Sequence, residues 1–129
     1  MFVALKEEAA YHEFNFSPSG EWAAYAFRDY RESTAPLAWD SDPEIKVRCT
    51  ENRLELEAAI SVDCRPPMQP CARLLVGLAA VIEEEGGVPS YWALKHPPGK
   101  PDFHHPESFA LEIEISDLQS ENESVKVKR

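Results

Sequence analysis

The sequence predicts an all-β protein folded as an antiparallel β-sandwich, and three observations lead to this fold class. Apolar and polar residues alternate with a period of two in several short segments, as they do in strands with one buried and one solvated face. Turn-forming segments rich in Pro, Gly, Ser and Asp separate these strands. The 129 residues suffice for one domain with a single core. Short strands joined by turns within one domain are typical of a β-sandwich.

The first expected element is a β-hairpin between residues 11 and 30. Residues 11–16 place aromatic and polar side chains on alternate faces, as a strand does. The Ser-Pro-Ser-Gly sequence at residues 17–20 predicts a four-residue connection, because these residues favour turns. A second β-rich run then extends from Trp22 to Tyr30.

Three further segments have the alternation of half-buried strands, with charged residues between the apolar ones. Each is expected to bury its apolar face and to leave its charged face in water. Those charged faces would carry much of the formal net charge of -10. The apolar positions are Ile45, Val47 and Cys49; Leu54, Leu56, Ala58, Ile60 and Val62; and Leu111, Ile113 and Ile115.

Residues 74–82 fit two structures. Their apolar residues have helical spacing, and Pro70 could precede a helix. Gly77, the turn-forming residues 86–89 and the return through residues 91–94 instead favour a buried strand that forms the first arm of a hairpin. We expect the strand.

The chain is expected to form one domain over residues 1–118 and a flexible tail over residues 119–129, which lack apolar mass. The acidic composition, with a pI near 4.8, argues against nucleic acid as a partner. The longest apolar run, residues 74–82, is too short to span a membrane. No secretory signal is visible, and Cys49, Cys64 and Cys71 have no framework spacing. We therefore expect free thiols and a cytoplasmic protein.

Polar and aromatic side chains concentrate in the 11–30 hairpin and in residues 91–109. One interpretation is that imidazoles and a carboxylate bind a divalent metal. Another is that aromatic faces, Glu13 and the polar residues of this set bind a sugar or a cofactor. A third is a rigid loop whose histidines bond backbone carbonyls. The candidate ligand-binding residues are Asn15, Trp22, Tyr25, Tyr91, Trp92, His96, Asp102, His104 and His105.

The tryptophans have a structural interpretation as well. For Trp22 and Trp92 we favour packing in or near the core over a role as a ligand platform, because large aromatic side chains are usually well buried. Trp39, between two prolines, is expected to be exposed. No catalytic residue is assigned, because the serines lack a nucleophile-elbow context and no cysteine has a recognised histidine partner.

Two stretches resemble signature segments of bacterial DOMON-like domain proteins, relatives of family-9-like carbohydrate-binding modules. They are YHEFNFSPSGEWAAYAFRDYR at residues 11–31 and YWALKHPPGKPDFHHPESF at residues 91–109. The resemblance implies a β-sandwich whose relatives bind haem or sugars as recognition or electron-transfer modules. Trp22 and Trp92 match tryptophans of these segments. Family members usually carry a further strand upstream, so the resemblance implies that the first strand or strands are missing here.

In haem-binding relatives a Met and a His hold the iron, and the internal methionine of this chain is Met68. The predicted function is non-enzymatic recognition of a small polar ligand, a carbohydrate or a related cofactor. The alternatives are a haem- or metal-binding protein, a metal-dependent enzyme using the loop from His96 to His105, and a structural module whose acidic sheet contacts a basic protein. No nucleic-acid or membrane partner is expected, and the oligomeric state is left open.

Overall fold

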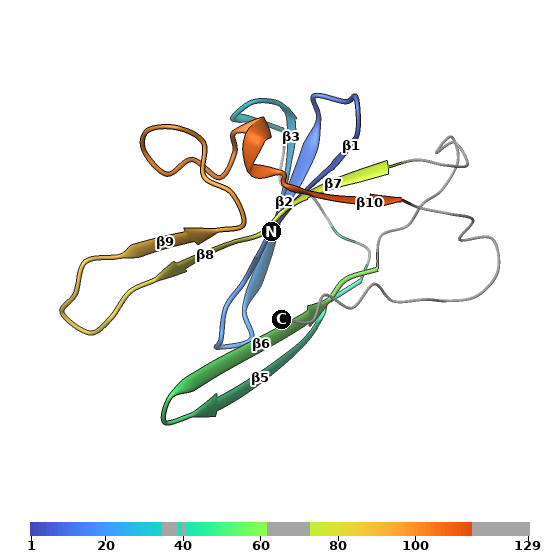
Figure 1. The fold of residues 1–129 in the computed structure, drawn as a ribbon. Helices are drawn as coiled ribbons and strands as arrows, with labels where there is room; N and C mark the ends of the chain where they lie inside the picture. The colour runs from blue at the N-terminus through green and yellow to red at the C-terminus, as the bar shows by residue number, and fades with distance from the viewer. Residues whose placement is uncertain (35–38, 40, 62–72, 115–129) are drawn as a thin grey trace.

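The computed structural model describes residues 1–34, 39, 41–61 and 73–114. Every strand pairing in these residues is antiparallel, and their one helical element is a short 3-10 turn, η1 (Pro106–Ser108). The predicted all-β class is therefore confirmed, and the arrangement is consistent with a β-sandwich (Figure 1).

In the described residues, ten strands form one large sheet and two hairpins. The six-stranded sheet has the order β10-β7-β1-β2-β3-β4, while β5–β6 and β8–β9 pair separately and extend away from it (Figure 1). The strands are β1 (Phe2–Leu5), β2 (Tyr11–Phe16), β3 (Trp22–Asp29), β4 (Glu32–Ser33), β5 (Glu44–Thr50), β6 (Arg53–Ala59), β7 (Arg73–Gly77), β8 (Ala79–Ile82), β9 (Ser90–Ala93) and β10 (Leu111–Glu114).

The main hydrophobic cluster lies on one face of the six-stranded sheet, the core face, and Phe2 and Tyr11 are buried on the other. Val3, Phe14 and Val76 come from three adjacent strands and are buried in this cluster, with Phe14 only 1% exposed. Because side chains alternate along a strand, every second residue of these strands points to this core face. Partly buried apolar side chains surround the three: Met1, Phe16, Ala24, Trp39, Ile60, Leu74, Leu78, Leu111 and Ile113.

The predicted hairpin over residues 11–30 is confirmed as β2 and β3, which pair from Tyr11–Phe27 to Phe16–Trp22. The connection is one residue longer than expected, because residues 17–21 separate the strands. The Ser17 amide donates to the Glu21 carbonyl at 2.9 Å and closes this loop. Gly20 adopts φ +87°, a conformation that favours glycine.

Residues 74–82 are strands and not a helix, but they belong to two sheets. β7 pairs with β1 on one side and β10 on the other, which explains its burial. After Leu78 the chain enters β8, which pairs with β9 in the expected hairpin. Val81 and Ile82 are exposed, so the expectation of a buried strand is right for β7 and wrong for β8.

The hairpin β5–β6 has the predicted strands but not the predicted burial. Ile45–Ala58, Val47–Leu56 and Cys49–Leu54 face each other across it, as the alternation requires. Leu54 is nevertheless 55% exposed. The apolar face is wrongly expected to be buried, because the hairpin extends beyond the six-stranded sheet (Figure 1).

Trp39 is wrongly expected to be exposed. Its ring lies edge-on to Phe14 at 4.9 Å between centroids and is partly buried against the core. Cys49 is a free, exposed thiol, as predicted. Among the described residues there is no helix long and apolar enough to cross a membrane. The predictions for Val62, Cys64, Met68, Cys71, Ile115 and residues 119–129 lie outside the described residues.

Candidate functional site

The loop after β9 packs against the side of the β2–β3 hairpin that faces away from the core. Directly opposed residues of antiparallel strands point to the same face, and alternation places three such pairs on this side. We call this surface the outer face of β2–β3; its pairs are Tyr11–Phe27, Glu13–Tyr25 and Asn15–Ala23.

His104 is the loop residue that contacts the outer face most closely. Its ring lies edge-on to Phe2 at 5.0 Å and to Phe27 at 5.1 Å, and 5.9 Å from the Tyr11 ring. Tyr11 in turn stacks on Phe27 at 4.7 Å and contacts Phe109 at 5.6 Å. The imidazole is therefore enclosed by aromatic rings from β1, β2 and β3.

The hydrogen bonds of Tyr11 assign the tautomer of His104. The Arg31 amide donates to the Tyr11 hydroxyl oxygen at 3.0 Å. The hydroxyl hydrogen is then available for His104 Nδ1, which lies 2.9 Å away. Neutral His104 consequently carries its hydrogen on Nε2, which faces Glu13 Oε2 at 3.9 Å.

Burial and charge act in opposite directions on His104. Desolvation lowers the pKa of the imidazole below its ordinary value, although the Glu13 carboxylate opposes this shift. The hydrogen bond from Tyr11 also favours the neutral imidazole, because it requires an unprotonated Nδ1. His104 is thus held in its neutral form near pH 7.

Asp102 fixes the loop to the end of β3. Its carboxylate accepts hydrogen bonds from the Tyr30 hydroxyl, from Arg31 Nη2 at 2.9 Å and from the His104 amide at 3.1 Å. Partial burial would raise the pKa of this carboxyl, but the three donors outweigh it, and the pKa lies below its ordinary value. Ser108 Oγ also donates to the Asp102 carbonyl at 2.9 Å.

The other two candidate histidines lie apart from this network. His105 caps η1, where its Nδ1 accepts a hydrogen bond from the Glu107 amide at 3.2 Å. His96 is exposed, and its ring lies 6.1 Å from Phe103. The structure therefore separates the functions of His104 and His105, which are adjacent in sequence.

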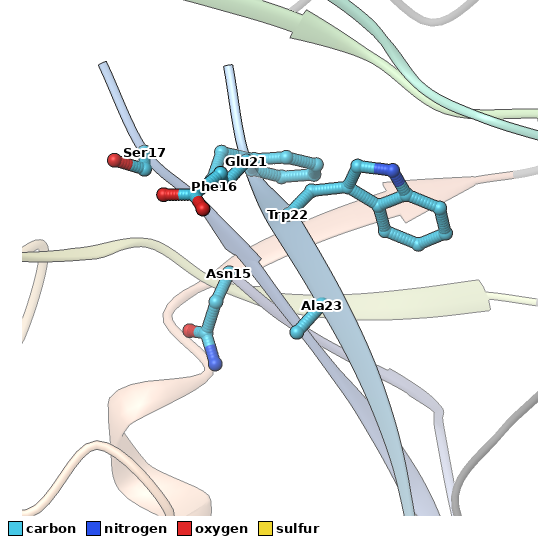
Figure 2. Close-up of a pocket in the computed structure, with 6 residues that line it drawn as sticks. All are labelled: Asn15, Phe16, Ser17, Glu21, Trp22 and Ala23. Atoms are coloured by element: carbon cyan, nitrogen blue, oxygen red, sulfur yellow. The ribbon is translucent and has the colours of Figure 1, made fainter. Parts of the chain in front are cut away.

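Asn15 and Trp22 border a shallow, open hollow of about 260 Å³ at the far end of the hairpin. Figure 2 shows their side chains pointing in different directions. The register explains this, because Asn15 opposes Ala23 on the outer face whereas Trp22 opposes Phe16 on the core face. Trp22 is half-buried, as expected for packing, and does not share a surface with Asn15.

Tyr25, Tyr91 and Trp92 are all exposed aromatic residues, but on different surfaces. Tyr25 is 40% exposed on the outer face, opposite Glu13. Tyr91 lies 6.3 Å from the Phe103 ring. Trp92 follows Tyr91 on β9 and so points to the other side of that hairpin. It is 60% exposed, which contradicts the expectation of packing, and its Nε1 donates to Ser90 Oγ at 3.0 Å.

The metal interpretation finds no ligand set in the part of the chain that the structure describes. No three His, Cys, Asp or Glu residues there are grouped to hold an ion. The Nδ1 atoms of His104 and His105 are already bonded to Tyr11 and to a backbone amide. The interpretation of a rigid capping loop agrees better with the observed contacts. The partners of His104 are nevertheless the side chains of Tyr11 and Glu13 and not backbone carbonyl groups.

Sequence reasoning missed three residues of this network: Tyr11, Tyr30 and Arg31. The alternation does place Tyr11 on the same face as Glu13 and Asn15, and this signal could have identified it. The contacts of Tyr30 and Arg31 with Asp102 cross about 70 residues of sequence, and periodicity carries no information about such pairs.

Comparisons with protein-family models, curated proteins and solved structures give no match to this chain. The resemblance to DOMON-like proteins therefore stays a prediction. The function has to be argued from the outer face of β2–β3 and the loop fixed against it.

Proposed function

We propose that the protein is a non-enzymatic binding module that recognises a carbohydrate on the outer face of β2–β3. The observation that carries the proposal is the hydrogen-bond network joining Tyr11, Arg31, Asp102 and His104. It holds the loop rigidly beside an exposed tyrosine, so the binding surface is formed before a ligand arrives. A preformed surface reduces the entropy lost on binding.

The chemistry of the exposed residues suits a sugar ring. Tyr25 presents a flat apolar surface on which the C–H groups of a sugar can pack. Asn15 lies on the same face and donates through Nδ2 to Glu13 Oε1 at 3.1 Å. Its Oδ1 bonds no described residue, so it is available to a hydroxyl group. An aromatic plane with a few fixed polar groups is a usual arrangement for small polar ligands.

The bonding of the titratable groups supports binding without catalysis. Glu13 is bonded to Asn15, Asp102 to Tyr30 and Arg31, and His104 to Tyr11. These groups position the surface and each other. The resemblance of residues 11–31 and 91–109 to relatives of carbohydrate-binding modules agrees with the proposal.

A ligand screen with two matched aromatic variants tests the proposal. We expect at least one mono- or oligosaccharide to raise the melting temperature of the wild-type protein and to bind in isothermal titration calorimetry. Tyr25→Ala should abolish this binding. Trp92→Ala removes an even more exposed aromatic residue from another surface and should leave the binding unchanged. Both variants should retain the wild-type circular dichroism spectrum.

The opposite results would overturn the proposal. Binding lost in Trp92→Ala and kept in Tyr25→Ala would place the site on β8–β9. No binding by any sugar would reject a carbohydrate ligand altogether. A Soret absorption band in the purified protein would identify a haem protein, and a stoichiometric metal after dialysis would identify a metalloprotein.

A further inference from the structure

The hairpin β5–β6 presents an apolar face that the described residues cover only in part: Ile45 and Ala58 are half-buried, and the other four residues are exposed. Leu54 is 55% exposed, and Val47 and Leu56 are also exposed large hydrophobic residues. All of them point to the same side, because the register pairs Val47 with Leu56 and Cys49 with Leu54. We call this surface the β5–β6 apolar face; it consists of Ile45, Val47, Cys49, Leu54, Leu56 and Ala58.

A hairpin of this kind needs an apolar surface against it. Two strands alone are marginally stable in water, and a packed hydrophobic face is what gives such a unit independent stability. Strands of seven residues each that alternate apolar and charged residues are built to be half-buried. Contiguous exposed apolar surface in a soluble protein commonly marks an interaction site.

The charge of the hairpin favours a second copy of the chain as the partner. Residues 44–59 hold three basic and four acidic residues, so they contribute one of the ten net negative charges of the chain. Some of these charges form ion pairs within the hairpin, Lys46–Glu44 at 2.7 Å and Arg53–Glu55 at 2.5 Å. Two copies of an acidic protein repel each other over most of their surface. They repel each other least where the net charge is nearly neutral and the face is apolar.

We propose that two copies of this protein associate through their β5–β6 apolar faces. The same patch then serves both copies, as a two-fold axis requires. Each hairpin covers the apolar face of the other, and the two form a four-stranded, two-layer unit with the usual spacing of about 10 Å between packed sheets. The outer face of β2–β3 takes no part in this contact, so dimerisation and ligand binding are independent proposals.

The mass in solution tests the dimer. We expect light scattering after size-exclusion chromatography to give twice the chain mass of 14.6 kDa at micromolar concentrations, and dilution to shift the population to monomer. Leu54→Glu puts a charge on the most exposed residue of this apolar face and should weaken association at least tenfold. Val81→Glu is the control, because Val81 is equally exposed, at 58%, but lies on β8. It should leave the dimer intact.

Cys49 gives a second measurement that does not depend on a destabilising variant. In a background with Cys64→Ser and Cys71→Ser, a short bis-maleimide should join two chains through Cys49, and Cys49→Ser should prevent it. A monomer at all concentrations overturns the proposal. So does a monomer whose Cys49 is protected from maleimide, because the apolar face would then be covered by another part of the same chain. Loss of the dimer in Val81→Glu but not in Leu54→Glu would also overturn it.

Discussion

The Tyr11 hydroxyl determines the state of His104 because it bonds two other parts of the chain at once. It accepts from the Arg31 amide at 3.0 Å and reaches His104 Nδ1 at 2.9 Å. Tyr11 itself is 4% exposed. A buried polar group that loses its partner keeps the cost of leaving water, so this one oxygen atom affects both the end of β3 and the loop.

Tyr11→Phe tests this role. The variant keeps the ring contacts with Phe27 and Phe109 but leaves the Arg31 amide and His104 Nδ1 without their partner. We expect the free energy of unfolding to fall by about 1–3 kcal/mol, measured by urea denaturation. Tyr25→Phe removes an exposed hydroxyl and should change it by less than about 0.5 kcal/mol. Equal effects of the two variants would contradict the assigned hydrogen bonds.

Stability should fall as the pH drops below about 6.5, the ordinary pKa of histidine. Burial lowers the pKa of both His104 and His12 in the folded protein. Between the unfolded and the folded pKa, the unfolded chain therefore binds more protons than the folded one. The contribution of the two neutral histidines to the free energy of unfolding is complete above pH 6.5. It is lost as the pH falls through the pKa values of the folded protein.

Two measurements check this pH dependence. Nuclear magnetic resonance titration of the His104 ring should give a midpoint below 6.5. His104→Gln should reduce the slope of melting temperature against pH between pH 7 and 5, whatever its effect on absolute stability. An unchanged slope would show that His104 does not contribute, and a midpoint above 6.5 would show that the Glu13 carboxylate outweighs burial.

For individual residues, the sequence predicts which side chains of a strand share a face but not which residues meet across the fold. Alternation is enough to place Asn15 with Glu13, whereas the side on which Tyr25 lies depends on the register, and the expected four-residue connection would have paired Tyr25 with His12. Alternation also places Trp22 and Tyr25 on opposite faces of their strand, but the observed register is what separates Trp22 from Asn15. The enclosure of His104 by rings from three strands depends on the path of the loop, which local sequence does not determine.

The strand β7 and the 3-10 turn η1 approach each other closely at Gly77. A Cβ atom at this position would lie 3.2 Å from the Ser108 carbonyl oxygen and 3.5 Å from Phe2 Cβ. Glycine is therefore favoured here by close approach and not by an unusual φ. The contact links the centre of the sheet to the turn that also supports Asp102 through Ser108 Oγ.

Gly77→Ala should displace η1 and destabilise the protein. The nearest atom belongs to the backbone and cannot rotate away, and overpacking of this kind costs about 1–3 kcal/mol. The free energy of unfolding is measured with denaturant. Val88→Ala, at a position 89% exposed, is the control and should change it by less than about 0.5 kcal/mol. A neutral Gly77→Ala variant would show that η1 moves without cost.

The strands themselves could be predicted well, because a period of two is a local property. β2, β3, β6 and β10 lie within the expected segments, and β5 and β9 match theirs to within one residue at each end. The burial of each strand could not be predicted in the same way. Whether an apolar face is covered depends on which sheet a strand joins, and residues 74–82 are divided between two sheets at Leu78.

For the whole molecule, the all-β antiparallel class follows from composition and alternation, whereas the strand order does not. β1 lies in the interior of the sheet, between β2 and β7. The pairing of β1 with β2 is local, but the pairing with β7 joins residues about 70 positions apart, such as Leu5 and Leu74. Hydrophobic patterning does not specify such a distant partner.

This interior position of β1 has a consequence during protein synthesis. A ribosome adds roughly 5–20 residues per second, so the 70 residues between Leu5 and Leu74 take roughly 4–14 s to be made. For most of that time β1 can pair with β2, but the edge of β1 that will bond β7 is still open. An open strand edge can pair with the edges of other chains. The nascent chain is therefore most vulnerable to aggregation before β7 leaves the ribosome, and chaperones that cover strand edges would act in that interval.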